Sequence, residues 1–466
     1  MKIRVLAAAT ALCCSATLPL AHATNGYMPH AFTPIAKGMG GAGEAALPQD
    51  ALSMVGNPAG PARVDRRLDV SASWFSPRRS YEGAGTGVVN TPMGPGFAFP
   101  VGGGANGTGE VNSEKNNFII PSVGYVHPLT DKSAIGIALF ANGGMNTTYS
   151  ASDTTGGVGT MGGATPMFGD GNGDAGINLE QMGLSLGYAQ DVSDTVSLGA
   201  SALVGYQRFS AEGLGLFQNF GMVTPGEEGK LTDNGTDSAW GYGFQVGGLW
   251  DVNPMLTLGA SYRTKTYMQK FDKYSGLFAN GGEFDVPALG AIGAAIRPHD
   301  RLTIALDIQH IWFSDVDSVG NDNLLAQKCN QMMGGVDTSY CLGGSNGAGF
   351  GWKDTTVFKV GVQYEVDDRL TLRAGYSKGN QPIEESQLAF NVLAPAVIEE
   401  HWSIGGTYAL NKRVDLGVWG MYSPEYSITG GGNPMTDASA FWSAGEAPTI
   451  KMRQYEVGVH FAWKFD

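Results

Sequence analysis

The segment that indicates the fold is residues 452–465, which read MRQYEVGVHFAWKF. From Tyr455 to Phe465 every second residue is a valine or an aromatic residue, and the residues between them are polar or small. A period of two is that of a β-strand, whose successive side chains point to opposite faces. One face suits lipid and the other suits an aqueous or ligand-filled interior, as in a membrane-spanning barrel strand.

The same alternation recurs along the chain and predicts fourteen strands. Their expected ranges are 67–76, 116–127, 132–141, 177–191, 195–209, 237–251, 255–265, 283–297, 301–312, 353–366, 369–378, 400–410, 412–422 and 452–465. Six short polar turns join the strands in pairs, and seven long stretches rich in glycine, asparagine, serine and aspartate lie between the pairs. This asymmetry is typical of an outer-membrane barrel with its turns in the periplasm and its loops outside.

A secreted β-sandwich or β-helix would also show alternation, so a second signal is needed. Aromatic residues such as Trp74, Tyr188, Trp250 and Trp402 stand near the ends of the expected strands, where rings of a membrane barrel meet the two lipid interfaces. A sandwich would have no need to segregate its loops by length. We therefore expect an all-β, 14-stranded antiparallel transmembrane β-barrel over residues 67–466.

Composition excludes several other classes. Of 466 residues 70 are glycine, 15% are charged and 10% are aromatic, and the formal net charge is −14. Glycine without a Gly-X-Y period is not collagen, and a chain rich in aromatics and poor in charge is not simply disordered. An acidic chain is also a poor partner for nucleic acid, because phosphate binding needs a basic face.

The first 23 residues have the pattern of a secretory signal peptide. Lys2 and Arg4 precede an apolar stretch, and Ala21-His22-Ala23 offers small residues for cleavage. Only Cys329 and Cys341 then remain in the mature chain. In an exported protein two such cysteines most often form a disulfide, whereas a free redox pair or a metal site would lack supporting ligands nearby.

Residues 24–66 precede the first expected strand and do not alternate. They are too apolar for a solvated tail, which suggests a plug folded back into the barrel lumen. The stretch contains KGMGGAG at 37–43, QDALS at 49–53 and NPAG at 57–60. These three pieces, in this order, resemble the N-terminal hatch signature of the FadL/TodX (OMPP1) family, with Asn57, Pro58 and Ala59 as its last motif.

The resemblance covers essentially the whole mature chain and implies a function. Members of that family are outer-membrane transporters of long-chain fatty acids and aromatic hydrocarbons. The resemblance implies capture of a hydrophobic compound on the outer loops, binding in the lumen and lateral release into the bilayer. It also implies an inward kink in the third strand, for which Asn142, Gly143 and Gly144 are the candidates; an ordinary loop start is the alternative.

Binding residues are expected in two groups. Two loops that match the family's capture groove carry unusually large apolar side chains, and the candidates are Leu214, Leu216, Phe217, Phe220, Phe271 and Phe278. Packing of the loops onto one another is the alternative. By alternation Arg263, Lys359 and Arg373 point inward, where they could hold a substrate carboxylate. They could equally pair with lumen carboxylates in a structural network, and a neutral substrate would need no cation.

The remaining expectations concern chemistry and partners. The histidines are scattered and metal-spaced ligands do not occur in the sequence, so we expect no catalytic residues, no metal and no cofactor. The expected partners are hydrophobic small molecules, outer-membrane lipid and the barrel-assembly machinery of a Gram-negative bacterium, with the protein as a monomer. A general porin or a surface adhesin is the alternative function.

Overall fold

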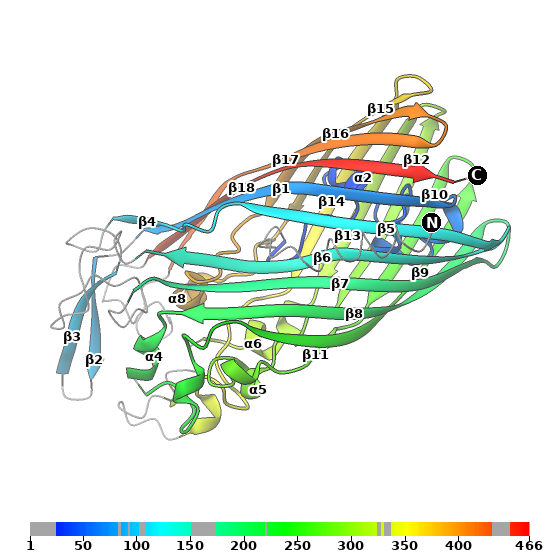
Figure 1. Cartoon of the computed structure of the whole chain (residues 1–466). Helices are drawn as coiled ribbons and strands as arrows, with labels where there is room; N and C mark the ends of the chain where they lie inside the picture. The colour runs from blue at the N-terminus through cyan, green and yellow to red at the C-terminus, as the bar shows by residue number, and fades with distance from the viewer. Residues whose placement is uncertain are drawn as a thin grey trace.

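The computed structural model describes residues 25–82, 85–91, 94–101, 109–150, 173–219, 221–323, 328–329, 337–430 and 448–465. Fourteen of the described strands form one antiparallel sheet whose path runs from β10 through β18 and β1 to β9. A further pairing of β9 with β10 closes this sheet into a barrel (Figure 1). The strands of the wall are β1 (Arg67–Glu82), β5 (Phe118–Thr130), β6 (Ser133–Tyr149), β7 (Ala175–Asp191), β8 (Val196–Glu212), β9 (Asp237–Asn253), β10 (Leu256–Arg263), β12 (Leu289–His299), β13 (Leu302–Ile311), β14 (Thr355–Glu365), β15 (Leu370–Gly379), β16 (Glu400–Asn411), β17 (Val414–Thr429) and β18 (Thr449–Lys464).

The strand prediction is confirmed, since each expected range overlaps one strand of the wall. The apolar side chains also lie on the expected face of the strands, the outer one. Along β18, Val457 and Val459 are 56% and 58% exposed on the outer face, whereas Glu456 and His460 on either side of this pair are buried on the inner face. The register of β1 against β18 is continuous from Arg67 opposite Lys464 to Glu82 opposite Thr449.

Several strands extend beyond their predicted ends. β1 continues to Glu82, β6 to Tyr149 and β17 to Thr429. The segment predicted as one long loop after β1 also contains a hairpin of β2 (Gly85–Thr91) and β3 (Gly94–Val101), and β4 (Glu110–Asn112) pairs with β1. β11 (Tyr267–Met268) pairs with β9. In the added part of β6 every residue is buried, so the alternation that predicts a strand is absent there.

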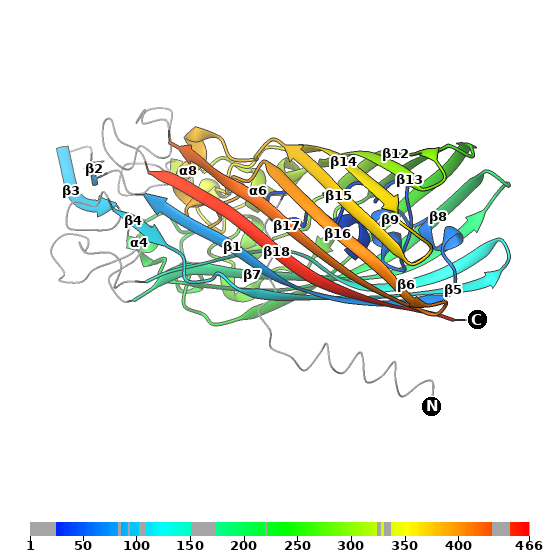
Figure 2. The ribbon, with the colours of Figure 1, turned by 90° about the horizontal axis from the view of Figure 1, so that it is seen from above.

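Loop length is segregated as predicted. The short turns lie at the end of the barrel that also carries the end of β18, and the β2–β3 hairpin and the helical loops lie at the opposite end (Figure 1). Figure 2 shows β16, β17, β18 and β1 running side by side along one flank.

The helices are all short. They are α2 (Pro34–Lys37), α3 (Ser53–Gly56), η1 (Gly60–Arg63), α4 (Gly215–Asn219), η2 (Glu228–Lys230), η3 (Asp272–Tyr274), α5 (Ala279–Gly282), η4 (Phe313–Asp315), α6 (Asp317–Gly320), η6 (Thr338–Tyr340), η7 (Glu385–Gln387) and α8 (Leu388–Asn391). Among the described residues none of these helices has the length and apolar character needed to cross a membrane.

Candidate functional site

Residues 25–64, called the N-terminal segment below, are almost entirely buried and pack against the inner face of the wall. Helix α2 contacts β16, β17 and β18, and η1 contacts β5, β6 and β7; Figure 1 shows α2 within the ring of strands. The backbone of the segment runs against inward-facing glycines. A side chain at Gly259 would overlap Ala45, and one at Gly375 would overlap Met39, so glycine permits this close approach.

Asn57 ties the end of the N-terminal segment to the wall. Its side-chain amide donates to the carbonyl oxygens of Ala45 at 2.7 Å, Gly248 at 3.0 Å and Ala260 at 3.3 Å. Its Oδ1 accepts from the backbone nitrogen of Ala59 at 3.0 Å, an Asx-type turn. The Asn-Pro-Ala motif therefore turns the chain and anchors it to the wall through one buried side chain.

A first polar cluster joins the segment to β14 and β18. Lys359 Nζ lies 3.5 Å from Glu44 Oε2 and donates to the carbonyl oxygen of His30 at 2.9 Å. Lys37 Nζ forms an ion pair of 2.5 Å with Glu456 Oε1, and all of these side chains are buried. Buried charges are stable only when they are paired and hydrogen-bonded. Here each buried charge of the segment has its partner in the wall, and each of these wall charges has its partner in the segment.

A second cluster lies near the short-turn end of the barrel. Arg67 forms two hydrogen bonds of 2.7 Å with Asp69, and His460 Nε2 lies 2.6 Å from Asp69 Oδ1. Asp69 also accepts from the backbone nitrogen of Ala51 at 2.9 Å. Burial, and next the negative charge of Asp69, raise the pKa of Asp50 in the N-terminal segment to about 6.

All three inward cations predicted to hold a substrate carboxylate contact the N-terminal segment. Lys359 has the contacts given above, and Arg373 donates to Gln49 Oε1 at 3.1 Å, to Gln363 and to Thr407. These contacts match the alternative of a structural network. A role of either residue in holding a ligand stays a prediction.

Arg263 lies apart from these two clusters. It donates to the carbonyl oxygen of Val55 at 2.6 Å and to Asn142 Oδ1 at 3.3 Å. Its guanidinium lies 4.6 Å from the ring centre of Phe32 and 5.4 Å from that of Phe140, at cation–π distance. Asn142, one of the predicted kink residues, and Arg263, one of the predicted inward cations, are therefore in direct contact.

An apolar cavity of about 40 Å³ lies between the long loops and the upper wall. Three predicted binding residues, Leu214, Phe217 and Phe278, line it. Phe271 lies one ring further away, with its centre 5.9 Å from that of Phe278. Of the other two candidates, the side chain of Leu216 and the whole of Phe220 are outside the described residues.

The cavity has contributors that alternation did not predict. They come from β6, β8 and two later loops, and include Met145, Phe209, Leu342, Phe350, Phe390 and Leu393. The run LAFNVLA at 388–394 is apolar enough for a loop that the same reasoning could have selected it. Met145 carried no such signal because it is an isolated apolar residue beyond the predicted end of its strand, and Phe209 carried none because an apolar residue on a barrel strand is expected anyway.

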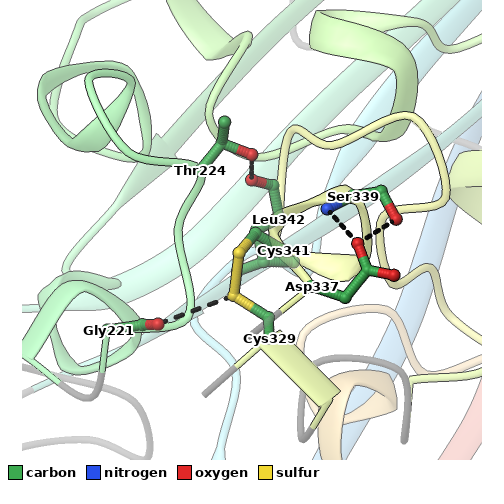
Figure 3. The surroundings of a disulfide bond; sticks show 7 residues. All are labelled: Gly221, Thr224, Cys329, Asp337, Ser339, Cys341 and Leu342. Atoms are coloured by element: carbon green, nitrogen blue, oxygen red, sulfur yellow. Dashed lines mark hydrogen bonds between the residues drawn. A yellow bond between two sulfur atoms is a disulfide. The ribbon is translucent and has the colours of Figure 1, made fainter. Parts of the chain in front are cut away.

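A disulfide joins Cys329 to Cys341, as the cysteine count predicted. Next to it Leu342 pairs with Val223 in an isolated parallel bridge. The carbonyl oxygen of Leu342 accepts from the Thr224 hydroxyl at 2.8 Å (Figure 3). Since Leu342 also lines the cavity, the bridge holds one loop on another at the roof of the cavity, and the disulfide closes a turn within one of these loops.

The wall is interrupted beside β6. β5 pairs with β6 only as far as Val123 opposite Leu139. Beyond this point the pairing of β6 with β7 shifts register between Ala141 and Gly143, and residues from Phe140 to Tyr149 are buried. Gly144 donates its backbone N–H to the carbonyl oxygen of Tyr27 in the N-terminal segment at 3.1 Å. The bulge therefore lies at Asn142, directly before Gly143 and Gly144, and the role of these three residues as a lateral gate stays a prediction.

The family described as outer membrane protein transport protein (OMPP1/FadL/TodX) matches residues 14–430, most of the chain. The chain belongs to this family. The resemblance predicted from residues 37–60 is thereby confirmed, as is the location in the outer membrane of a Gram-negative cell. FadL/TodX proteins are described as transport proteins, which agrees with the expectation that this chain is not an enzyme.

Relatives of this FadL/TodX-family chain are distant in sequence. It is 24% identical over 357 residues to the long-chain fatty acid transport protein of Escherichia coli (strain K12), a match that spans 70% of this chain and 75% of that protein. It is 21% identical over 402 residues to the 47 kDa outer membrane protein of Pasteurella multocida (strain Pm70), spanning 80% and 81% of the two chains.

Solved structures share the fold of this FadL/TodX-family protein. The toluene transporter TodX of P. putida superposes with a TM-score of 0.65 at 17% identity, covering 94% of this chain and 99% of that one. A FadL homologue from Pseudomonas aeruginosa gives a TM-score of 0.65 at 17% identity, covering 95% and 100%. These likenesses support the closed 14-stranded barrel.

Proposed function

We propose that this protein takes up hydrophobic compounds, either long-chain fatty acids or aromatic hydrocarbons, through the outer membrane. The names of its relatives, a fatty acid transport protein and a toluene transporter, support this substrate class.

In this proposal residues 1–23 are a signal peptide, residues 24–66 are a hatch that plugs the lumen, and the barrel begins at residue 67. The burial and wall contacts of residues 25–64 support the plug.

The observation that carries the proposal is the position of Met145. This residue lines the apolar cavity and lies on the part of β6 that β5 leaves unpaired. A compound held in the cavity is therefore next to an interruption in the wall. Lateral release into the bilayer through this interruption would avoid moving an apolar molecule through water, which is unfavourable in proportion to its apolar surface.

The size of the cavity indicates that a ligand must displace the loops. A volume of 40 Å³ is too small for either substrate class. For comparison, a cavity that binds benzene measures about 150 Å³. In this proposal Leu214, Phe217 and Phe278 separate from the opposite loops to admit a ligand, and Phe271 supports them from behind. Leu216 and Phe220 stay candidates of the same capture surface, and Arg263 is the inward cation nearest to the interruption.

The test is the Gly143→Val/Gly144→Val variant. A side chain at Gly143 would overlap Tyr27 and straighten or block the bulge, so uptake of labelled oleate or toluene by cells should fall while the barrel still assembles. Gly420→Val on β17 is the control, since the nearest atom to a new Cβ there is 3.9 Å away. Assembly is checked by the heat-dependent shift of the band on a denaturing gel. Unaltered uptake by an assembled double variant would contradict the lateral route.

Native mass spectrometry of the purified protein would separate the two substrate classes. A co-purified fatty acid would support a carboxylate contact, for which Arg263, Lys359 and Arg373 are the candidates. A neutral hydrocarbon would leave these cations to the structural network.

A further inference from the structure

The outer face of the wall carries a hollow of about 890 Å³ across β14 to β18 and β1. Its lining is mainly apolar and aromatic and includes Trp74, Trp402, Ile404, Tyr422, Tyr455 and Val457. Ile404 is 69% exposed and Trp402 is 54% exposed, so these side chains point away from the lumen. Figure 2 shows β16, β17, β18 and β1 adjacent on this flank.

Two arginines stand at the upper rim of this hollow. Arg78 on β1 lines the hollow and is directly opposite Arg453 on β18 in the register of the sheet. Both side chains are exposed. Each lies an even number of residues from an outward-facing aromatic residue of its strand, Trp74 for Arg78 and Tyr455 for Arg453, so both point outward. Like charges directly opposite each other across two strands are destabilising, so the pair needs an explanation.

The protein supplies little to neutralise this pair. Among the described residues neither Arg78 nor Arg453 forms an ion pair. The neighbouring Lys451 is paired with Glu82 at 2.6 Å. Glu425 lies in the irregular part of β17 that faces Arg453, where the register shifts between Ser423 and Tyr426, and it forms no ion pair with that arginine. Two guanidinium groups therefore remain for an external anion.

The height of the pair on the wall matches the lipid headgroups of the outer leaflet. The outward apolar residues of β18 run from Trp463 up to Tyr455, about 27 Å along the strand and roughly 20 Å along the membrane normal at the usual tilt. This is about the thickness of the apolar band of an outer-membrane barrel. Arg453 follows one outward position above Tyr455, on the side of the long loops.

We propose that this face binds one molecule of a phosphorylated, multiply acylated glycolipid of the outer leaflet, of the lipid A type. Its phosphate lies between Arg78 and Arg453, since paired guanidinium groups match phosphate in geometry and charge. Its acyl chains fill the hollow along Trp74, Tyr455 and Ile404. The site is on the opposite side of the wall from the N-terminal segment and is independent of the proposed transport function.

The test measures binding of fluorescent diphosphorylated lipid A to the purified full-length protein in detergent. The Arg78→Ala/Arg453→Ala variant should bind at least about tenfold more weakly, because it loses charge-assisted hydrogen bonds. Lipid A from which the phosphates have been removed should bind the unchanged protein as weakly. Arg369→Ala/Lys412→Ala, which removes the same charge from exposed positions in the short turns, is the matched control and should bind normally.

The same preparations check folding. The double arginine variant should retain the heat-dependent gel shift of the barrel and should unfold no earlier than the unchanged protein in lipid-free detergent, because a repulsive pair has been removed. Equal affinity of this variant and the unchanged protein would overturn the proposal. So would equal affinity for the two forms of lipid A, or an equal loss in the control.

Discussion

Asn57 shows how one buried side chain fixes a segment of about forty residues. It donates to three carbonyl oxygens, one from the N-terminal segment and two from the wall. Asn57→Ala should lower the free energy of unfolding by about 2–3 kcal/mol, because each lost hydrogen bond contributes about 1 kcal/mol. Urea unfolding in lipid vesicles, followed by tryptophan fluorescence, measures this change.

Asn57→Asp is the matched control for the donors. It keeps the side-chain oxygen that accepts from Ala59 but removes both amide hydrogens. We expect it to be as destabilising as the alanine variant. A stability close to that of the unchanged protein would mean that the turn, and not the anchoring to the wall, is what the motif contributes.

Asp50 predicts a pH dependence of stability. Its pKa is raised from 3.8 to about 6, chiefly by burial, so the folded protein holds this proton more tightly than the unfolded chain. The contribution of Asp50 to stability is therefore full below about pH 4, declines as the pH rises to about 6 and is constant above that. The difference of about two pKa units corresponds to about 3 kcal/mol.

Asp50→Asn isolates this contribution. The free energy of unfolding of the variant, minus that of the unchanged protein, should increase by up to about 3 kcal/mol between pH 4 and pH 7. Asp69, Arg67 and His460 face Asp50 in the folded protein and are unchanged in the variant, so the difference between the two proteins reports Asp50. A difference that does not depend on pH would show that Asp50 is ionised throughout this range in the folded protein.

For the inward cations, the sequence predicts the face that each side chain occupies but not its partner. Alternation predicted that Arg263, Lys359 and Arg373 point inward, and all three are buried. It could not predict that Lys359 meets Glu44, because these residues are far apart in the sequence and share no local pattern. Alternation tells which face a side chain occupies, whereas its partner depends on how the N-terminal segment folds inside the barrel.

At the scale of an element, β6 departs most from its prediction. Alternation ends at Ala141 because residues beyond it are buried on both faces, and a strand with no exposed face carries no period-two signal. The sequence nevertheless marks the position through Gly143 and Gly144. Sequence reasoning thus located the irregularity, and the structure shows a strand that continues past it to Tyr149.

The disulfide belongs to the same scale because it closes a turn within the connection between β13 and β14, which the Val223–Leu342 bridge joins to a second loop. The variant Cys329→Ser/Cys341→Ser should leave the barrel assembled but make the loop around Leu342 more sensitive to protease. Closing a loop of this length contributes about 3 kcal/mol in chain-entropy estimates, which would raise the local cleavage rate by about a hundredfold. Limited proteolysis with and without a reducing agent measures it.

The outcome is informative either way. If reduction of the unchanged protein reproduces the effect of the double serine variant, the covalent link accounts for the protection. If neither treatment alters cleavage, the Val223–Leu342 bridge and its hydrogen bonds hold the roof without it.

For the whole molecule, the question is whether the N-terminal segment closes the lumen. Deletion of residues 24–60 should raise the ion conductance of the protein in planar bilayers to that of an open barrel, because the helices of this segment contact β5, β6 and β7 as well as β16, β17 and β18. Cells with the deletion should also become sensitive to large antibiotics. Conductance like that of the unchanged protein would count heavily against a plug and would favour a barrel narrowed by its own side chains.

The sequence by itself determined the barrel, its strand number, the segregation of its loops and its family. These features follow from alternation, turn residues and short motifs, all of which are local along the chain. Only the tertiary structure decided which inward cations meet the N-terminal segment, where the apolar cavity closes, and that Arg78 and Arg453 stand opposite each other. The physical reason is that burial of charge and apolar surface depends on residues brought together from distant parts of the chain, and no local pattern records those encounters.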